Sequence, residues 1–226
     1  MPDSTAPPAW VIAIVSQKGG VGKSMLTMAL ASAMTDSSGR ALVVDTDPQA
    51  TTVDAVEELH DVEYDVAHEL DPQVLPQISR MRRHDVLYAD TPGSLEGFQV
   101  LEQVTKHAHF GLIPHVDEPS SDKPTKRTSD MLTQAGVPHA AVINRVDSRG
   151  GASAVLDARK NLEDLQVPYL QSYIRQYSGY PKSLKRGQTI HQWKGHYGAH
   201  MRADIGRVQA EVQRRLTRIA QQGGGL

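Results

Sequence analysis

Residues 11–24 read VIAIVSQKGGVGKS and join an apolar run to a glycine-rich, basic loop. The first five residues are apolar and mostly β-branched, which is typical of a strand covered on both faces of a parallel sheet. Gly19, Gly20 and Gly22 follow and permit a tight turn in which successive backbone N–H groups point inward. Such a loop at the start of a helix cradles phosphate oxygens. The stretch therefore predicts a phosphate-binding loop between a buried strand and a helix.

The end of the stretch carries the residue types of a P-loop. Lys23 is placed to reach the β- and γ-phosphates of a nucleotide, and the Ser24 hydroxyl to ligate Mg²⁺. The ordinary pattern G-x-x-x-x-G-K-[ST] has glycine where this chain has Gln17, so the loop is a variant. A second lysine, Lys18, precedes the glycine pair and has the reach to contact phosphates outside its own loop. The alternative is a glycine-rich turn without function, and the order of strand, loop and helix argues against it.

The loop KGGVGKS resembles the deviant Walker A motif of the ParA/MinD family of P-loop ATPases. The resemblance covers about residues 9–219 and, in so short a chain, is strongest to small plasmid-type ParA proteins. It implies binding of ATP and Mg²⁺ and an ATP-dependent homodimer in which Lys18 reaches the partner's nucleotide. It extends to LIP at 112–114 and VINRVD at 142–147, and it departs from the family at PHVDEPSSD, 114–122, a loop that helps to form the dimer. The nucleotide-binding residues that it implies are Lys18, Gly19, Gly20, Val21, Gly22, Lys23, Ser24 and Met25, with Asn144, Arg145, Arg175 and Gln176 near the base.

Composition limits the possible classes of protein. At 226 residues and 39% hydrophobic content, the chain suits a single domain with a sizeable core. It has no cysteine, which excludes disulfides, thiolate metal sites and the relatives that hold iron–sulfur clusters. No run of about 18 apolar residues and no signal-peptide pattern occur, so we expect a soluble cytoplasmic protein.

Apolar runs alternate with helical patterns along the chain. The runs 11–15, 41–44, 85–89, 110–113, 140–143 and 167–173 predict strands, and 24–35 predicts the helix that follows the phosphate loop. The alternation favours a doubly wound, mostly parallel α/β sheet flanked by helices, the P-loop NTPase fold, as a single domain over 10–221. We expect a disordered N-terminus at 1–9, short helices around the nucleotide at 52–82 and a flexible tail at 222–226.

Acidic residues follow two of the predicted strands. Asp90 ends the strand 85–89, and carboxyl ends of parallel strands are where ligands bind, so Ser24 and Asp90 are the expected Mg²⁺ ligands, directly or through water. In DTDPQ, the resemblance makes Asp47 the residue that orients the attacking water, and Asp45 a structural or outer-shell residue. Lys18, Lys23 and Asp47 are thus the expected catalytic residues, although an isolated aspartate more often caps a helix or forms a turn.

Charge is distributed unevenly. Residues 172–226 carry ten Lys and Arg against two acidic residues, which indicates a polyanionic partner. The apolar spacing over 201–219 predicts an amphipathic helix whose far side presents Arg207, Arg214 and Arg218. A solvated helix face would look the same, and a second cluster, Lys182, Lys185 and Arg186, favours a DNA surface.

These features favour a ParA-type ATPase for plasmid, phage or chromosome partitioning in the nucleoid of a bacterial host. It would bind non-specific DNA as an ATP dimer and hydrolyse ATP when a centromere-binding, ParB-like protein stimulates it. One alternative is a MinD-like ATPase that cycles on and off the membrane, and another is a metabolic enzyme such as a small ligase, which would have no use for Lys18. For His191, His196 and His200, a surface role is favoured over a zinc site.

Overall fold

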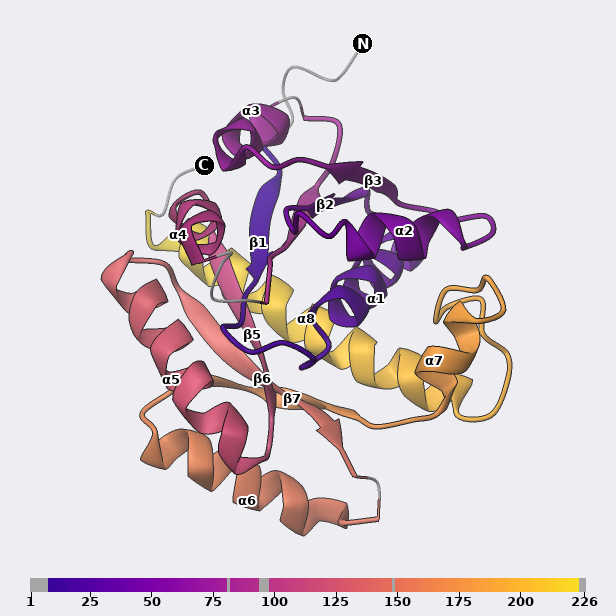
Figure 1. Cartoon of the computed structure of the whole chain (residues 1–226), viewed down its shortest axis with the longest axis vertical. Coiled ribbons are helices and arrows are strands. Elements are labelled where there is room, and N and C mark those ends of the chain that lie inside the picture. Colours follow the sequence, from indigo (N-terminus) through magenta and orange to yellow (C-terminus); the bar gives the residue numbers. More distant parts are fainter. Residues whose placement is uncertain (1–7, 81, 94–97, 148, 224–226) are drawn as a thin grey trace.

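Seven strands form one parallel sheet at the centre of the protein (Figure 1). The computed structural model describes residues 8–80, 82–93, 98–147 and 149–223. The order across the sheet is β3-β2-β4-β1-β5-β6-β7, and every pairing is parallel. The predicted doubly wound α/β fold is confirmed. The strands are β1 (Trp10–Ile14), β2 (Ala41–Asp45), β3 (Asp65–His68), β4 (Val86–Asp90), β5 (Phe110–Val116), β6 (His139–Val146) and β7 (Tyr169–Arg175).

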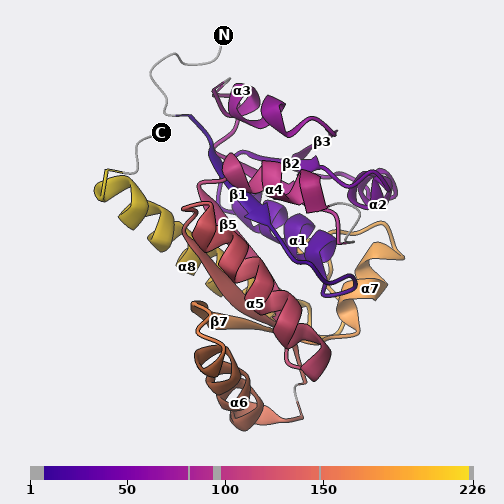
Figure 2. The same cartoon turned by 60° about the vertical axis from the view of Figure 1, so that its left-hand side comes forward.

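Helices cover both faces of the sheet, and each face has its own hydrophobic core (Figure 2). Ile12 and Ile14 of β1 face the core that contains α1 (Lys23–Asp36) and α8 (Gly198–Gln221). Val11, Ala13 and Val15 face the other core, and this two-sided burial explains the unbroken apolar run. That second core contains α3 (Leu75–Arg80), α4 (Phe98–Lys106), α5 (Pro119–Gln134) and α6 (Gly151–Asp164). The remaining helices are α2 (Thr51–Glu57), the 3₁₀ turn η1 (Pro72–Val74) and α7 (Gly179–Leu184).

The order of the strands places the phosphate loop where successive connections lead to opposite sides of the sheet. β1 lies between β4 and β5, with β2, β3 and β4 on one side of it and β5, β6 and β7 on the other. In open α/β sheets, ligands bind at such a switch point, outside the carboxyl ends of the strands. The loop that follows β1 and the residues that follow β4 therefore meet at one edge.

The structure differs from the expected organisation in two places. The segment 52–82 contains a strand, β3, besides short helices, and β3 pairs with β2 from Leu42–Asp65 to Asp45–His68. β3 is short and its ends are exposed, so it lacks the apolar run that identified the other strands. Residues 1–7 of the expected disordered N-terminus lie outside the described residues, whereas Ala9 is buried and exchanges hydrogen bonds with Ser79.

Candidate functional site

The phosphate loop connects β1 to α1 as predicted. Gly20 and Gly22 have φ angles of +75° and +92°, in the left-handed region that side chains with a Cβ rarely adopt. Gly22 is the N-cap of α1, and its carbonyl accepts the first hydrogen bond of the helix from the Leu26 N–H. α1 thus begins at the loop with its first backbone N–H groups available to an anion.

Lys23 is buried at the first position of α1, with 8% of its surface exposed. Burial lowers the pKa of its ammonium, and the nearby carboxylates of Asp90 and Asp47 oppose that shift. Gly93, in the loop after β4, leaves room for the ammonium, because a Cβ there would lie 2.5 Å from Lys23 Nζ. A desolvated ammonium next to a glycine-lined space is suited to receive phosphate oxygens.

Ser24 and Asp90, the predicted metal ligands, are brought together. Asp90 is almost fully buried at the end of β4 and accepts a hydrogen bond from the Thr52 hydroxyl at 2.6 Å, and Ser24 lies close enough to lower the pKa of its carboxyl. Burial raises the pKa of this carboxyl to about 6, against the opposing effect of these two residues. Hard oxygen donors at a site that disfavours uncompensated negative charge fit Mg²⁺, which Ser24 and Asp90 would hold and which would neutralise phosphate charge.

The two acids after β2 have different surroundings. Asp45 is fully buried and accepts backbone N–H groups of Asp47, Thr52 and Val53 at 2.9–3.2 Å, so it fixes the start of α2. These contacts agree with the structural role that was one of its two expected roles. Asp47 is partly exposed, accepts the Gln49 N–H at 3.0 Å, and is close enough to Lys23 to affect the lysine's pKa. Its position beside the phosphate loop suits a water-orienting role, which stays a prediction.

The residues expected near the base line one cavity of about 510 Å³. It extends from Gly22 and Met25 to the carboxyl ends of β6 and β7, and the Asn144 side chain donates to the Val21 carbonyl at 2.8 Å, which ties the cavity to the loop. Tyr177 and Tyr180 also line it and supply apolar area that suits a purine ring. Neither tyrosine was predicted from the sequence, because no motif marks them. The predicted residues on the cavity wall are Gly22, Met25, Asn144, Arg145, Arg175 and Gln176.

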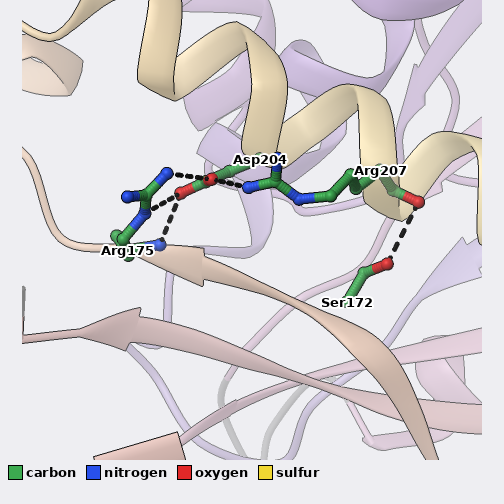
Figure 3. A network of polar contacts seen from close by, with 4 residues as sticks. All are labelled: Ser172, Arg175, Asp204 and Arg207. Carbon is green, nitrogen blue, oxygen red and sulfur yellow. Dashed lines mark hydrogen bonds and ion pairs between the residues drawn. The ribbon is translucent and has the colours of Figure 1, made fainter. Parts of the chain in front are cut away.

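One carboxylate joins this cavity to the C-terminal helix (Figure 3). Asp204 of α8 is fully buried and accepts from the Arg175 guanidinium at 2.9 and 2.6 Å and from the Arg175 N–H at 3.1 Å. Arg207, on the next turn of α8, pairs with the same carboxylate from the other side. Arg175 therefore lines the cavity in a fixed orientation, and Arg207 is not a free surface cation.

The basic side chains expected to bind DNA form two separate patches. Lys182 and Lys185 are exposed on or next to α7, and Arg186 lies over the Trp193 ring at 5.4 Å. Arg207, Arg214, Arg215 and Arg218 line a groove of about 450 Å³ between β7 and α8. The first patch lies near the amino end of α8, where Gly179 contacts Met201, and the groove lies toward the carboxyl end (Figure 1). The sequence did not indicate this separation.

Lys18 lies outside the phosphate cradle. Its ammonium contacts Glu118, the N-cap of α5, and Ser120 and Ser121 in the first turn of that helix. The segment 114–122, expected to be a loop, instead contains the end of β5 and the start of α5. No sequence motif indicated that this segment holds Lys18.

Comparison with known proteins identifies the family. A model described as the CobQ/CobB/MinD/ParA nucleotide binding domain matches residues 12–190. The chain belongs to this family. The predicted relationship to ParA/MinD P-loop ATPases is therefore confirmed.

Individual relatives match nearly the whole chain. It is 29% identical over 206 residues to "Maintenance of carboxysome distribution protein A" of Gloeobacter kilaueensis, which covers 90% of this chain and 94% of the relative. Its fold resembles that of the MinD cell division protein of Aquifex aeolicus, with a TM-score of 0.73 at 20% identity, over 88% of this chain and 96% of that one. It also resembles a Cyanothece McdA variant in complex with ATP, with a TM-score of 0.70 at 13% identity, over 92% and 98%. These structural likenesses show the shared fold.

Two other features concern a membrane-spanning helix and the C-terminal histidines. In the described ranges, no helix is both long and apolar enough to cross a membrane. Of the three C-terminal histidines, His191 faces Asp36 at 3.3 Å, whereas His196 and His200 both pack against Tyr197.

Proposed function

We propose that this chain is a ParA-type positioning ATPase that binds ATP with Mg²⁺, dimerises and then binds non-specific DNA. The observation that carries the proposal is that two lysines of one loop have different surroundings. Lys23 is buried beside Asp90, where it suits the nucleotide of its own subunit. Lys18 points away from that site, toward the first turn of α5, so we assign it to the nucleotide of the partner subunit.

Hydrolysis in this proposal depends on residues at the carboxyl ends of three strands. The loop and Lys23 neutralise phosphate charge, Ser24 and Asp90 hold Mg²⁺, and Asp47 orients the attacking water. The relatives support the choice of nucleotide, since the Cyanothece McdA structure is an ATP complex. After hydrolysis the dimer would separate and release DNA.

The cargo has two candidates. The short chain, which resembles small plasmid-type ParA proteins, favours a DNA molecule marked by a ParB-like protein. The 29% identity over nearly the full length of a carboxysome distribution protein favours a protein compartment, reached through an adaptor protein. In both cases the ATPase would be cytoplasmic, associated with the nucleoid and regulated by its partner.

A binding experiment tests the common core of the proposal. Fluorescence anisotropy of a labelled DNA duplex of arbitrary sequence should show tight binding with a slowly hydrolysed ATP analogue and weak binding with ADP or no nucleotide. Vesicles with anionic lipid, tested with the same nucleotides, provide the comparison. Binding to vesicles but not to DNA would replace the proposal with a MinD-like membrane cycle.

A second experiment distinguishes the cargoes. In the organism that encodes the chain, deletion of the gene should disturb either the inheritance of a resident DNA molecule or the spacing of a labelled protein compartment. Restoration by the parent gene, but not by the Lys23→Ala variant, would link the effect to nucleotide binding.

A further inference from the structure

Lys18 is fully occupied within its own subunit. Its ammonium forms an ion pair with Glu118 and donates to the hydroxyls of Ser120 at 2.7 Å and Ser121 at 3.0 Å. An ammonium has three N–H donors, so these three acceptors leave none for another ligand. Only 21% of the Lys18 side chain is exposed, although the loop beside it is open.

The acceptors are held by ordered structure. Glu118 is the N-cap of α5 in extended backbone geometry, and its N–H donates to the Val116 carbonyl at 2.8 Å. Ser121 is buried in the first turn of α5, and its N–H donates to the Glu118 carbonyl at 2.8 Å. The holder of Lys18 is therefore built on the end of β5 and the start of α5.

We propose that Glu118 is a positioning residue that retains Lys18 in its own subunit and thereby sets how readily ATP joins two subunits. This inference rests on the cross-subunit role of Lys18 in the proposed function. For Lys18 to reach the partner's phosphates, it must first leave Glu118, Ser120 and Ser121. A triphosphate carries more negative charge than one carboxylate, so bound ATP in the partner competes for the ammonium and ADP competes less well.

The strength of the retention follows from its exposure. Glu118 is 48% exposed, and ion pairs at such positions are weak, equivalent to a change of about 1.5- to 5-fold in an equilibrium constant. A symmetric dimer must release two Lys18 side chains, so the effect on its dimerisation constant is squared, to about 2- to 30-fold. Such a contact raises the threshold for dimerisation without preventing it.

Glu118→Gln tests the inference, because it removes the charge and keeps the size of the side chain. Sedimentation velocity with a slowly hydrolysed ATP analogue should show dimers at several-fold lower protein concentration than in the parent. Affinity of the monomer for a fluorescent ATP analogue should not change. Asp117→Asn is the matched control, since Asp117 is the adjacent exposed carboxylate and makes no hydrogen bond to Lys18 in the described structure.

The double variant Lys18→Ala/Glu118→Gln separates this role from a merely structural one. The Glu118→Gln effect should vanish when Lys18 is absent. Dimerisation of Glu118→Gln that is equal to or weaker than that of the parent would overturn the inference, even where Lys18→Ala abolishes the dimer. A normal ATP dimer of Lys18→Ala would instead overturn the cross-subunit contact on which the proposed function depends.

Discussion

Buried charges of opposite sign face one another at the phosphate loop. Burial lowers the pKa of Lys23 and raises that of Asp90, so the protein makes both charged forms costly before a ligand arrives. Phosphate oxygens would stabilise the ammonium, and a magnesium ion would stabilise the carboxylate. Nucleotide and metal together would therefore compensate both buried charges.

Substitution of Lys23 tests the phosphate site. Lys23→Ala removes the buried cation that faces the phosphates, so we expect ATP affinity to fall by about 100-fold or more. Equilibrium titration with a fluorescent ATP analogue measures this. Unchanged affinity would show that the nucleotide binds elsewhere.

The raised pKa of Asp90 makes stability depend on pH. The carboxyl binds its proton more tightly in the folded state, with a pKa of about 6 against an ordinary value of 3.8. Its stabilising contribution is therefore present below about pH 4 and is lost as the pH rises through 6. Without metal or nucleotide, Asp90→Asn should match the parent near pH 4 and exceed its free energy of unfolding by about 3 kcal/mol at pH 7.5.

Denaturant titrations at both pH values measure that difference. Added Mg²⁺ and ADP should stabilise the parent at pH 7.5 more than they stabilise Asp90→Asn, because the variant lacks the carboxylate that would hold the metal. A constant difference between the two proteins across this pH range would show that Asp90 does not titrate there.

Asp47 is assigned to the attacking water, so its loss should affect the transition state. Asp47→Ala should keep ATP binding and dimerisation while turnover falls by about 100-fold, since water orientation matters only during reaction. Phosphate release under saturating ATP measures turnover. Parent-like turnover would transfer the role to another acid.

At the scale of single elements, α8 places its acids against β7 and its arginines at the surface. Asp204 and Glu211 are the only acids in 172–226, and both are buried against β7. Glu211 accepts the Gln171 and Ser172 N–H groups at 2.9 and 2.8 Å, while Asp204 accepts that of Arg175. The net positive charge of this region therefore reflects acids placed inside and arginines placed outside.

The arginines of the groove between β7 and α8 differ in whether they are free to contact DNA phosphates. Arg207 is bound to Asp204, whereas Arg214 and Arg218 are exposed and make no ion pair with any described residue. Arg214→Glu/Arg218→Glu should weaken DNA binding on unrelated sequences and flatten the slope of log K against log salt by about 2 per subunit. The charge-matched control is Arg127→Glu/Lys160→Glu on α5 and α6, which cover the other face of the sheet. If both pairs behave alike, the α8 groove is only a solvated surface.

Sequence patterns predicted the contacts that a motif or a strand end marks and missed those that have no such mark. The approach of Ser24, Lys23 and Asp90 followed from a motif and from strand ends that meet at one edge. β3 was missed because an exposed edge strand needs no apolar run. The Glu118 contact with Lys18 joins residues 100 positions apart, and no pattern records that pairing. Arg207 looked free because its spacing on the helix does not show that Asp204 is buried beside it.

At the scale of the whole molecule, one subunit carries two small basic patches at opposite ends of α8. Each patch can neutralise only a few phosphates, which is too few for tight binding at physiological salt. An ATP dimer would carry twice as many patches. Because ATP is needed to form the dimer, this doubling of basic patches accounts for the proposed dependence of DNA binding on ATP.

Salt titrations test the effect of pairing. The ATP-loaded parent should show a slope of log K against log salt about twice that of the Lys18→Ala variant, which we expect to remain monomeric. Anisotropy titrations at four or five salt concentrations give both slopes. Equal slopes with different affinities would mean that dimerisation changes the geometry of binding and not the number of phosphates contacted.

The hydrogen bonds between α8 and β7 limit how other proteins can bind to this one. Besides the N–H groups that Asp204 and Glu211 accept, the Tyr169 carbonyl receives the Arg215 guanidinium at 2.9 Å. A peptide strand added to the sheet next to β7 would lie against backbone groups that are already hydrogen-bonded to α8. The opposite edge is β3, a short strand with an aspartate and a histidine at its exposed ends. Partner proteins should therefore recognise side chains of helices and loops and should not bind by adding a strand to the sheet.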